Sequence, residues 1–138
     1  MKVFKSISII LLVFLMVECK PVQKTAMGLL GDKTWELNSM SGISSLEESF
    51  PSGVPTLEFL EAGKLAGFSG CNNFSGIYSL EGKKLKLDPG AMTRKACQGN
   101  GESSFITALG QVIKFQSSGD EIKLLGESGE LMSFIPKN

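Results

Sequence analysis

The chain has 138 residues, with 14 basic and 14 acidic side chains and no histidine. This length is that of a single domain, and the balanced charge shows neither the basic stripe of a nucleic-acid-binding protein nor a charged, disordered block. Without histidine, the chain lacks both the general base of Ser-His and Cys-His nucleophiles and any His-ligated metal site.

The N-terminal segment has the layout of a bacterial export signal. Two lysines precede an apolar run from Ile7 to Val17, which is too short to span a membrane, and a cysteine follows at position 19. Residues 15–19 resemble the lipobox of bacterial lipoproteins, in which cleavage leaves a lipidated Cys19. Glu18 departs from that pattern, because the residue before the cysteine is usually small. An ordinary secretory signal cut elsewhere and an uncleaved anchor are the alternatives.

These features predict a lipoprotein-type signal peptide over residues 1–18, a tether over residues 19–32 and a folded domain over residues 33–138. Several acyl chains on Cys19 would hold the protein stably on a membrane, whereas one chain anchors only marginally. We therefore expect an exported monomer in the bacterial cell envelope. Its lipid anchor would attach it to the outer membrane or to the periplasmic face.

After residue 32, short segments with period-two alternation are separated by glycine turns, which is typical of antiparallel strands. A long polar connection over residues 39–54 has room for a helical turn at residues 44–48. Lysines alternate with leucines in one strand, which predicts one solvent-facing side, and Pro89-Gly90 is expected to end it. The predicted strands cover residues 34–37, 56–60, 64–68, 74–80, 83–87, 113–116, 121–125 and 131–135.

The period changes over residues 102–112, where Phe105, Ile106, Leu109 and Val112 fall at helical spacing after a helix start signal. The predicted fold class is mostly β (α+β). We expect a single strongly curved antiparallel sheet or small barrel of about seven to eight strands, with one helix packed across its open side.

The stretch GCNNFSG, residues 70–76, connects two predicted strands. Its glycines allow positive φ or a close backbone approach, and Asn72 and Asn73 tolerate left-handed backbone and bond to nearby amides. These properties favour a structural turn. The competing interpretation, a reactive thiol at Cys71, requires a thiol pKa lowered by a helix N-terminus or by nearby cations.

The other cysteine beyond the signal is Cys97, 26 residues after Cys71. This spacing does not form a CxxC redox motif, and two thiols alone do not build a zinc site. In an exported protein such a pair is more often a disulfide, so we predict a Cys71–Cys97 bridge, with two buried thiols as the alternative. We expect no metal and no cofactor.

The segments GCNNFSGIY and AMTRKAC, followed by Glu102-Ser103-Ser104-Phe105, resemble the META domain, the family of HslJ-like heat-shock proteins. The resemblance covers roughly residues 33–136. It implies a mostly β fold with one helix, in single-domain bacterial lipoproteins or exported proteins. It implies no established enzyme activity and only loose links to stress, motility and virulence.

The two cysteine-bearing loops predict an interaction patch made of Asn72, Asn73, Thr93 and Arg94. Thr93 is expected to bond local backbone. The guanidinium of Arg94 could bind an anion or a partner's carboxylate. The favoured interpretation is instead that Arg94 pairs with Glu102 or Asp88 and holds its loop.

The leading functional prediction is a non-catalytic bacterial envelope lipoprotein with a protein-interaction or stress-related role. Its partner would be an envelope protein, in addition to the membrane reached through Cys19. The alternative is a small apolar-ligand carrier with a pocket inside the barrel. An enzyme that uses carboxylates is the weakest alternative, because no two of the candidates are placed together by the sequence. Those candidates are Glu58, Glu61, Asp88 and Glu102.

Overall fold

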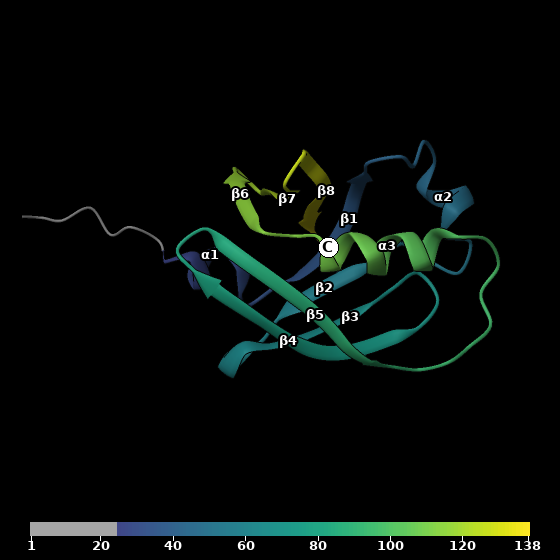
Figure 1. Ribbon diagram of the computed structural model, residues 1–138, viewed down its shortest axis with the longest axis horizontal. Helices are drawn as coiled ribbons and strands as arrows, with labels where there is room; N and C mark the ends of the chain where they lie inside the picture. Colours follow the sequence, from purple (N-terminus) through teal and green to yellow (C-terminus); the bar gives the residue numbers. More distant parts are fainter. Residues whose placement is uncertain (1–24) are drawn as a thin grey trace, which may run out of the picture.

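A computed structural model describes residues 25–138, whose eight strands form one antiparallel sheet closed into a ring (Figure 1). The strands are β1 (Thr34–Met40), β2 (Thr56–Phe59), β3 (Lys64–Phe68), β4 (Asn73–Glu81), β5 (Lys84–Met92), β6 (Lys114–Ser118), β7 (Glu121–Gly126) and β8 (Gly129–Pro136). The helices are α1 (Ala26–Leu30), α2 (Leu46–Ser49), α3 (Gly101–Gly110) and the short 3₁₀ turn η1 (Glu61–Gly63). None of these helices is long and apolar enough to cross a bilayer.

Each strand pairs with its neighbour in the chain, and β1 pairs with β8 to close the ring. The closure is not that of a regular barrel, because β5 and β6 share only the residue pair Lys84 and Lys114. Beyond this pair the two strands diverge. The predicted fold class, a strongly curved mostly β structure, is confirmed.

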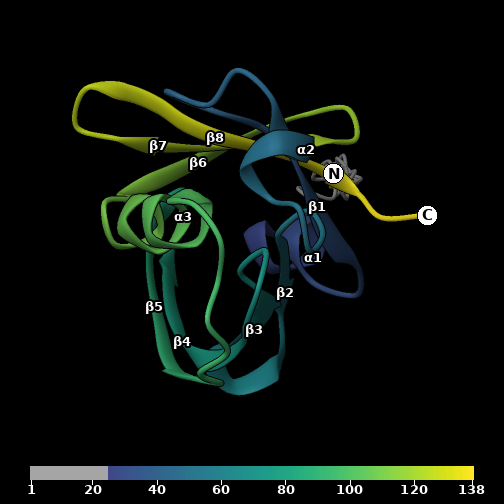
Figure 2. The ribbon, with the colours of Figure 1, turned by 90° about the vertical axis from the view of Figure 1, so that its right-hand side faces the viewer.

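Helix α3 occupies the opening left by the short β5–β6 pairing. Figure 2 shows it between the β4–β5 hairpin and the strands β6 to β8. Phe105 is completely buried on its inner face, and its ring lies 6.4 to 6.5 Å from the rings of Phe50, Phe74 and Phe134. The helix predicted over residues 102–112 is thus present at residues 101–110, and it packs across the open side of the sheet as expected.

The interior of the ring is filled by large apolar side chains. Along β7 the buried positions alternate strictly, because successive side chains of a strand point to opposite faces. The same alternation brings inward the side chains of Trp35, Leu37, Leu57, Leu65, Leu85, Phe115, Ile122, Leu124, Met132 and Phe134. Burial of apolar surface stabilises a fold by about 25 cal/mol per Å². A packed interior of this kind gives the carrier alternative no support.

We expected strand β5 to end at Pro89-Gly90, but it continues to Met92. The register with β4 shifts just beyond, between Gly90 and Met92, and the Asp88 carboxylate accepts a hydrogen bond from the Gly90 amide at 2.9 Å. Past Lys84, β5 has no partner on its β6 side. Proline is tolerated in strands at such edges and bulges, since it has no N–H to donate to a neighbouring strand.

The packed part of the chain begins before residue 33, within the segment that we assigned to the tether. The Thr25 hydroxyl accepts a hydrogen bond from the Gly28 amide at 3.2 Å and caps α1. Leu30 is fully buried, and its carbonyl accepts from the Trp35 indole at 2.8 Å. The remaining tether residues 19–24, the lipidation residue Cys19 and the signal peptide 1–18 lie outside the described residues.

Candidate functional site

The GCNNFSG stretch forms a tight turn between β3 and β4. The Ser69 amide donates to the Asn72 carbonyl at 2.8 Å, which closes the turn. Gly70 has φ +95°, and a Cβ there would collide with the ring of Phe50. Only glycine meets both demands, because it alone adopts positive φ without strain and leaves space for the ring.

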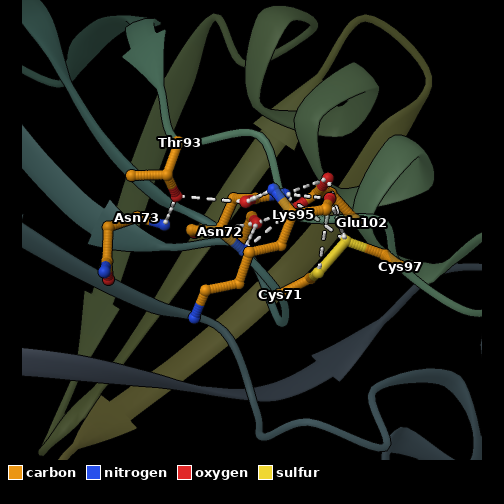
Figure 3. The surroundings of a disulfide bond; sticks show 8 residues. Cys71, Asn72, Asn73, Thr93, Lys95, Cys97 and Glu102 are labelled. Atoms are coloured by element: carbon orange, nitrogen blue, oxygen red, sulfur yellow. Dashed lines mark hydrogen bonds between the residues drawn. A yellow bond between two sulfur atoms is a disulfide. The ribbon is translucent and has the colours of Figure 1, made fainter.

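Asn72 is buried at the centre of a hydrogen-bond network (Figure 3). Its side-chain oxygen accepts from the Lys95 amide at 2.7 Å and from the Thr93 hydroxyl at 3.0 Å. Its side-chain nitrogen donates to the Lys95 carbonyl at 3.2 Å and to the Glu102 carboxylate at 2.9 Å. One amide group therefore fixes the 93–97 loop against both the turn and α3.

Glu102 lies in the first turn of α3, where a negative charge is favoured by the helix dipole. Its carboxylate also accepts from the backbone amide of Asn72 at 3.0 Å and from the Ser69 hydroxyl. In the described part of the chain, no buried side-chain nitrogen or oxygen lacks a hydrogen-bond partner. The site is therefore organised around a carboxylate that is surrounded by donors.

The predicted disulfide between Cys71 and Cys97 is present, with the two Cα atoms 5.9 Å apart. It joins the turn to the 93–97 loop beside the Asn72 network, as Figure 3 shows. Closing a loop of 26 residues contributes about 3.5 kcal/mol in the chain-entropy estimate. The bridge and the network thus hold the same two segments by independent means.

The two sulfur atoms lie within 4.8 Å of each other and of a Glu102 carboxylate oxygen, a grouping that could hold a metal ion if both thiols were free. Zinc is bound by cysteine as a thiolate. Because each sulfur is bonded to the other, neither is available as a thiolate ligand.

The four residues of the predicted interaction patch separate into a buried member and three exposed ones. Asn72 is only 3% exposed and is held in the internal network, so it is not a contact residue. Asn73, Thr93 and Arg94 are exposed. Asn73 and Thr93 pair through their backbones, with Thr93 N–H donating to the Asn73 carbonyl at 3.0 Å.

Arg94 does not have the structural partner that we favoured. The ion pairs found in residues 25–138 are Lys123–Glu130 and Lys137–Glu36, and Arg94 is in neither. The position expected for it at Glu102 is taken by Asn72, whose amide donates to that carboxylate. The guanidinium is left at the exposed surface of the 93–97 loop.

Sequence reasoning missed two parts of the network. Ser69 was not singled out, and Glu102 was considered only as a partner of Arg94 or as a catalytic candidate. A hydroxyl three residues before Asn72 is a common local bonding pattern for turns. No comparable local signal connects Asn72 with Glu102, because they lie 30 residues apart.

A depression of about 590 Å³ lies over this network on the outer surface. It is bounded by residues 90–96, with Asn72 and Glu102 at its base. The cationic side chains beside it are Arg94 and Lys95, both exposed. Fold and site together define a small, disulfide-bridged β ring with a cationic rim above a buried polar network.

The META domain family matches residues 28–138, and the chain belongs to this family. One similar solved structure is the NMR structure of a protein from Burkholderia xenovorans, with 25% identity and a TM-score of 0.62, covering 82% of this chain and 87% of that one. Another is the crystal structure of a DUF4847 family protein from Bacteroides vulgatus ATCC 8482. It has 14% identity and a TM-score of 0.60, and it covers 79% of this chain and 95% of that one. No curated protein matches the chain.

Proposed function

We propose that this META domain protein is a non-catalytic, monomeric lipoprotein of the bacterial cell envelope. A lipid on Cys19 would hold it on the membrane, and its folded domain would contact an envelope protein, in the stress-related setting that the family resemblance suggests. The observation that carries the proposal is the contrast between the internally bonded groups near the disulfide and the exposed cation beside them. The reactive groups there are taken up in internal bonds, and the unpaired Arg94 stands exposed above them.

The hydrogen bonds of three of the four candidate carboxylates support a non-catalytic role. Glu102 is surrounded by donors from Ser69 and Asn72. Glu58 accepts from the Thr34 hydroxyl at 2.6 Å, and Asp88 accepts from a backbone amide of its own bulge. Each of these carboxylates accepts a structural hydrogen bond. None of them is paired with a second carboxylate within residues 25–138, as acid–base catalysis by two carboxylates would require.

Partner contact is best supported at the 93–97 loop. The disulfide and the Asn72 network order this loop before any partner arrives, which lowers the entropy lost on binding. An exposed guanidinium presents a planar fork that bonds a carboxylate through two parallel hydrogen bonds. The loop therefore suits an acidic surface on the partner.

A photo-crosslinking residue in place of Ala96, in the same loop as Arg94, compared with one in place of Asp120 in the β6–β7 turn, tests this contact in native membranes. We expect a discrete adduct from position 96 and none from position 120. With the crosslinker at position 96, Arg94→Glu should lower capture of the same partner, whereas Lys64→Glu, with the same charge change at the start of β3, should leave it unaltered. Identical adducts from both positions, or none from position 96, would refute the contact.

A further inference from the structure

Four exposed lysines gather where β5 and β6 meet: Lys83 in the β4–β5 turn, Lys84 and Lys86 on β5, and Lys114 on β6. We call this surface the lysine groove. The groove has a volume of about 630 Å³ and is lined by Lys84, Lys86 and Lys114 together with Leu80 and Ile113, while Lys83 is next to it in the chain. Residues 25–138 carry more acidic than basic side chains, so this concentration of positive charge is a local feature.

Lys84 and Lys114 stand directly opposite each other. The Leu85 amide donates to the Ile113 carbonyl and the Phe115 amide donates to the Lys83 carbonyl, each at 3.0 Å. A residue pair flanked by such bonds is a non-hydrogen-bonded pair, in which antiparallel side chains come closest.

Like charges in directly opposite positions destabilise a sheet. Neither Lys84 nor Lys114 forms an ion pair with another residue of the described chain. The one carboxylate lining the groove is that of Glu81 on β4, which lies opposite Lys84 on β5. One acidic group against three lining lysines leaves a net positive surface, and an anion placed between Lys84 and Lys114 would relieve their repulsion.

The floor of the groove is apolar. Ile113 is 39% exposed, and Leu80 is half-buried beside it. An apolar floor with a cationic rim complements the boundary of an anionic bilayer, where phosphates lie above acyl chains.

The groove lies at the same end of the molecule as α1. Figure 1 places the β4–β5 turn and α1 at the same end of the long axis, and the 93–97 loop toward the other end. The Tyr78 hydroxyl on β4 lies 3.0 Å from the Met27 sulfur of α1, which ties the hairpin to the helix. Five residues lie between Cys19 and Thr25, so the two are at most about 22 Å apart along an extended chain.

We propose that the lysine groove binds the anionic phospholipid headgroups of the bilayer to which the chain is tethered. This inference rests on the proposed lipidation of Cys19, which keeps the α1 end within reach of the surface. Docking at the groove fixes the orientation of the domain, with Arg94 and the disulfide turned away from the membrane toward a partner.

The test uses the full chain purified with its lipid and reconstituted in vesicles of phosphatidylcholine, alone or mixed with phosphatidylglycerol. Amine-reactive labelling followed by peptide mass spectrometry measures each lysine separately. We expect Lys84 and Lys114 to be less labelled on the anionic vesicles, with Lys95 at the opposite end labelled equally on both. The difference should vanish at high salt, because exposed charges are then screened.

Lys114→Glu separates docking from folding. It replaces a like-charged pair by an opposite-charged one, so the thermal midpoint should rise, while docking weakens about fivefold or more. Lys95→Glu makes the same charge change away from the groove and should leave the protection of Lys84 intact. Unchanged protection of Lys84 in Lys114→Glu would overturn the inference, as would equal labelling of the groove lysines on both kinds of vesicle.

The same mass spectra distinguish the docking proposal from the lipoprotein proposal. Acyl mass on Cys19 with unprotected groove lysines would refute docking and leave the lipoprotein proposal standing. A chain without acyl mass would refute the proposed anchor. Docking of that chain is then read from its co-sedimentation with the two kinds of vesicle, where a preference for the anionic vesicles supports it and no preference overturns it.

Discussion

The amide group of Asn72 joins three segments: the turn before β4, the 93–97 loop and the first turn of α3. Its oxygen faces two donors and its nitrogen faces two acceptors, so no other side chain of that size satisfies all of them. The network is therefore sensitive to the chemistry of this one group and not only to its shape.

Asn72→Asp keeps the shape of the side chain but removes both N–H donors and places a second carboxylate against Glu102. We expect this change to lower the free energy of unfolding by about 3 kcal/mol. Asn73→Asp adds the same charge on the exposed neighbour and should cost no more than about 0.5 kcal/mol. Urea unfolding followed by the fluorescence of Trp35, the only tryptophan, measures both variants. Equal losses in the two variants would show that Asn72 has no special role.

Tyr78 is the only tyrosine in the chain, so the phenolate absorbance reports this side chain alone. Desolvation by burial raises its pKa above the ordinary value of 10.0. The unfolded chain therefore ionises first, and the stability linked to this group is complete below pH 10 and is lost as the pH rises through the folded pKa.

A spectroscopic titration of the folded protein should give a midpoint above that of the urea-unfolded chain. Tyr78→Phe should lack the corresponding fall in stability above pH 10. Coincident midpoints in the folded and unfolded chains would contradict the partial burial of this hydroxyl against Met27 of α1 and the Leu60 carbonyl.

The β4–β5 hairpin is the longest strand pair in the described chain, and it bends where Gly76 lies against Asp88 and Pro89, next to the bulge between Gly90 and Met92. A Cβ at position 76 would collide with the backbone of Asp88 and Pro89. The bend carries β5 from the lysine groove toward the disulfide, so it connects the two ends of the molecule.

Gly76→Ala should therefore destabilise the fold by about 3 kcal/mol, because neither backbone can move aside without breaking the bulge. Gly110→Ala, at the end of α3, is the matched control. A Cβ there meets no described atom within 4 Å, and alanine raises helix propensity by up to about 1 kcal/mol. Unfolding curves of the two variants should shift in opposite directions, and a neutral Gly76→Ala would rule out the close approach.

For the whole molecule, the local patterns were sufficient to place most elements. Alternation of apolar residues identified the strands, as in Glu121–Gly126, and helical spacing identified α3. The choice between a curved sheet and a small barrel stayed open, because closure depends on β1 pairing with β8 at the far end of the chain. The continuation of β5 past Pro89 was also missed, since whether a strand has a free edge is decided by its neighbours.

The candidate site was also predictable only in part. The disulfide was inferred from two cysteines in a chain with a predicted export signal. The roles of Asn72 and Arg94 were not predictable, because burial decides them. The polar Asn72 turned inward to satisfy Glu102, and the charged Arg94 was left outside. Residue type alone does not distinguish these outcomes.

The central claim is that the protein is a lipid-anchored domain with a bridge between Cys71 and Cys97. The most direct test is the intact mass of the mature protein from native membranes, with and without reduction and alkylation. The account predicts added acyl mass on Cys19, no alkylation before reduction, and alkylation of Cys71 and Cys97 afterwards. A species without acyl mass, whose thiols are alkylated before reduction, would contradict it.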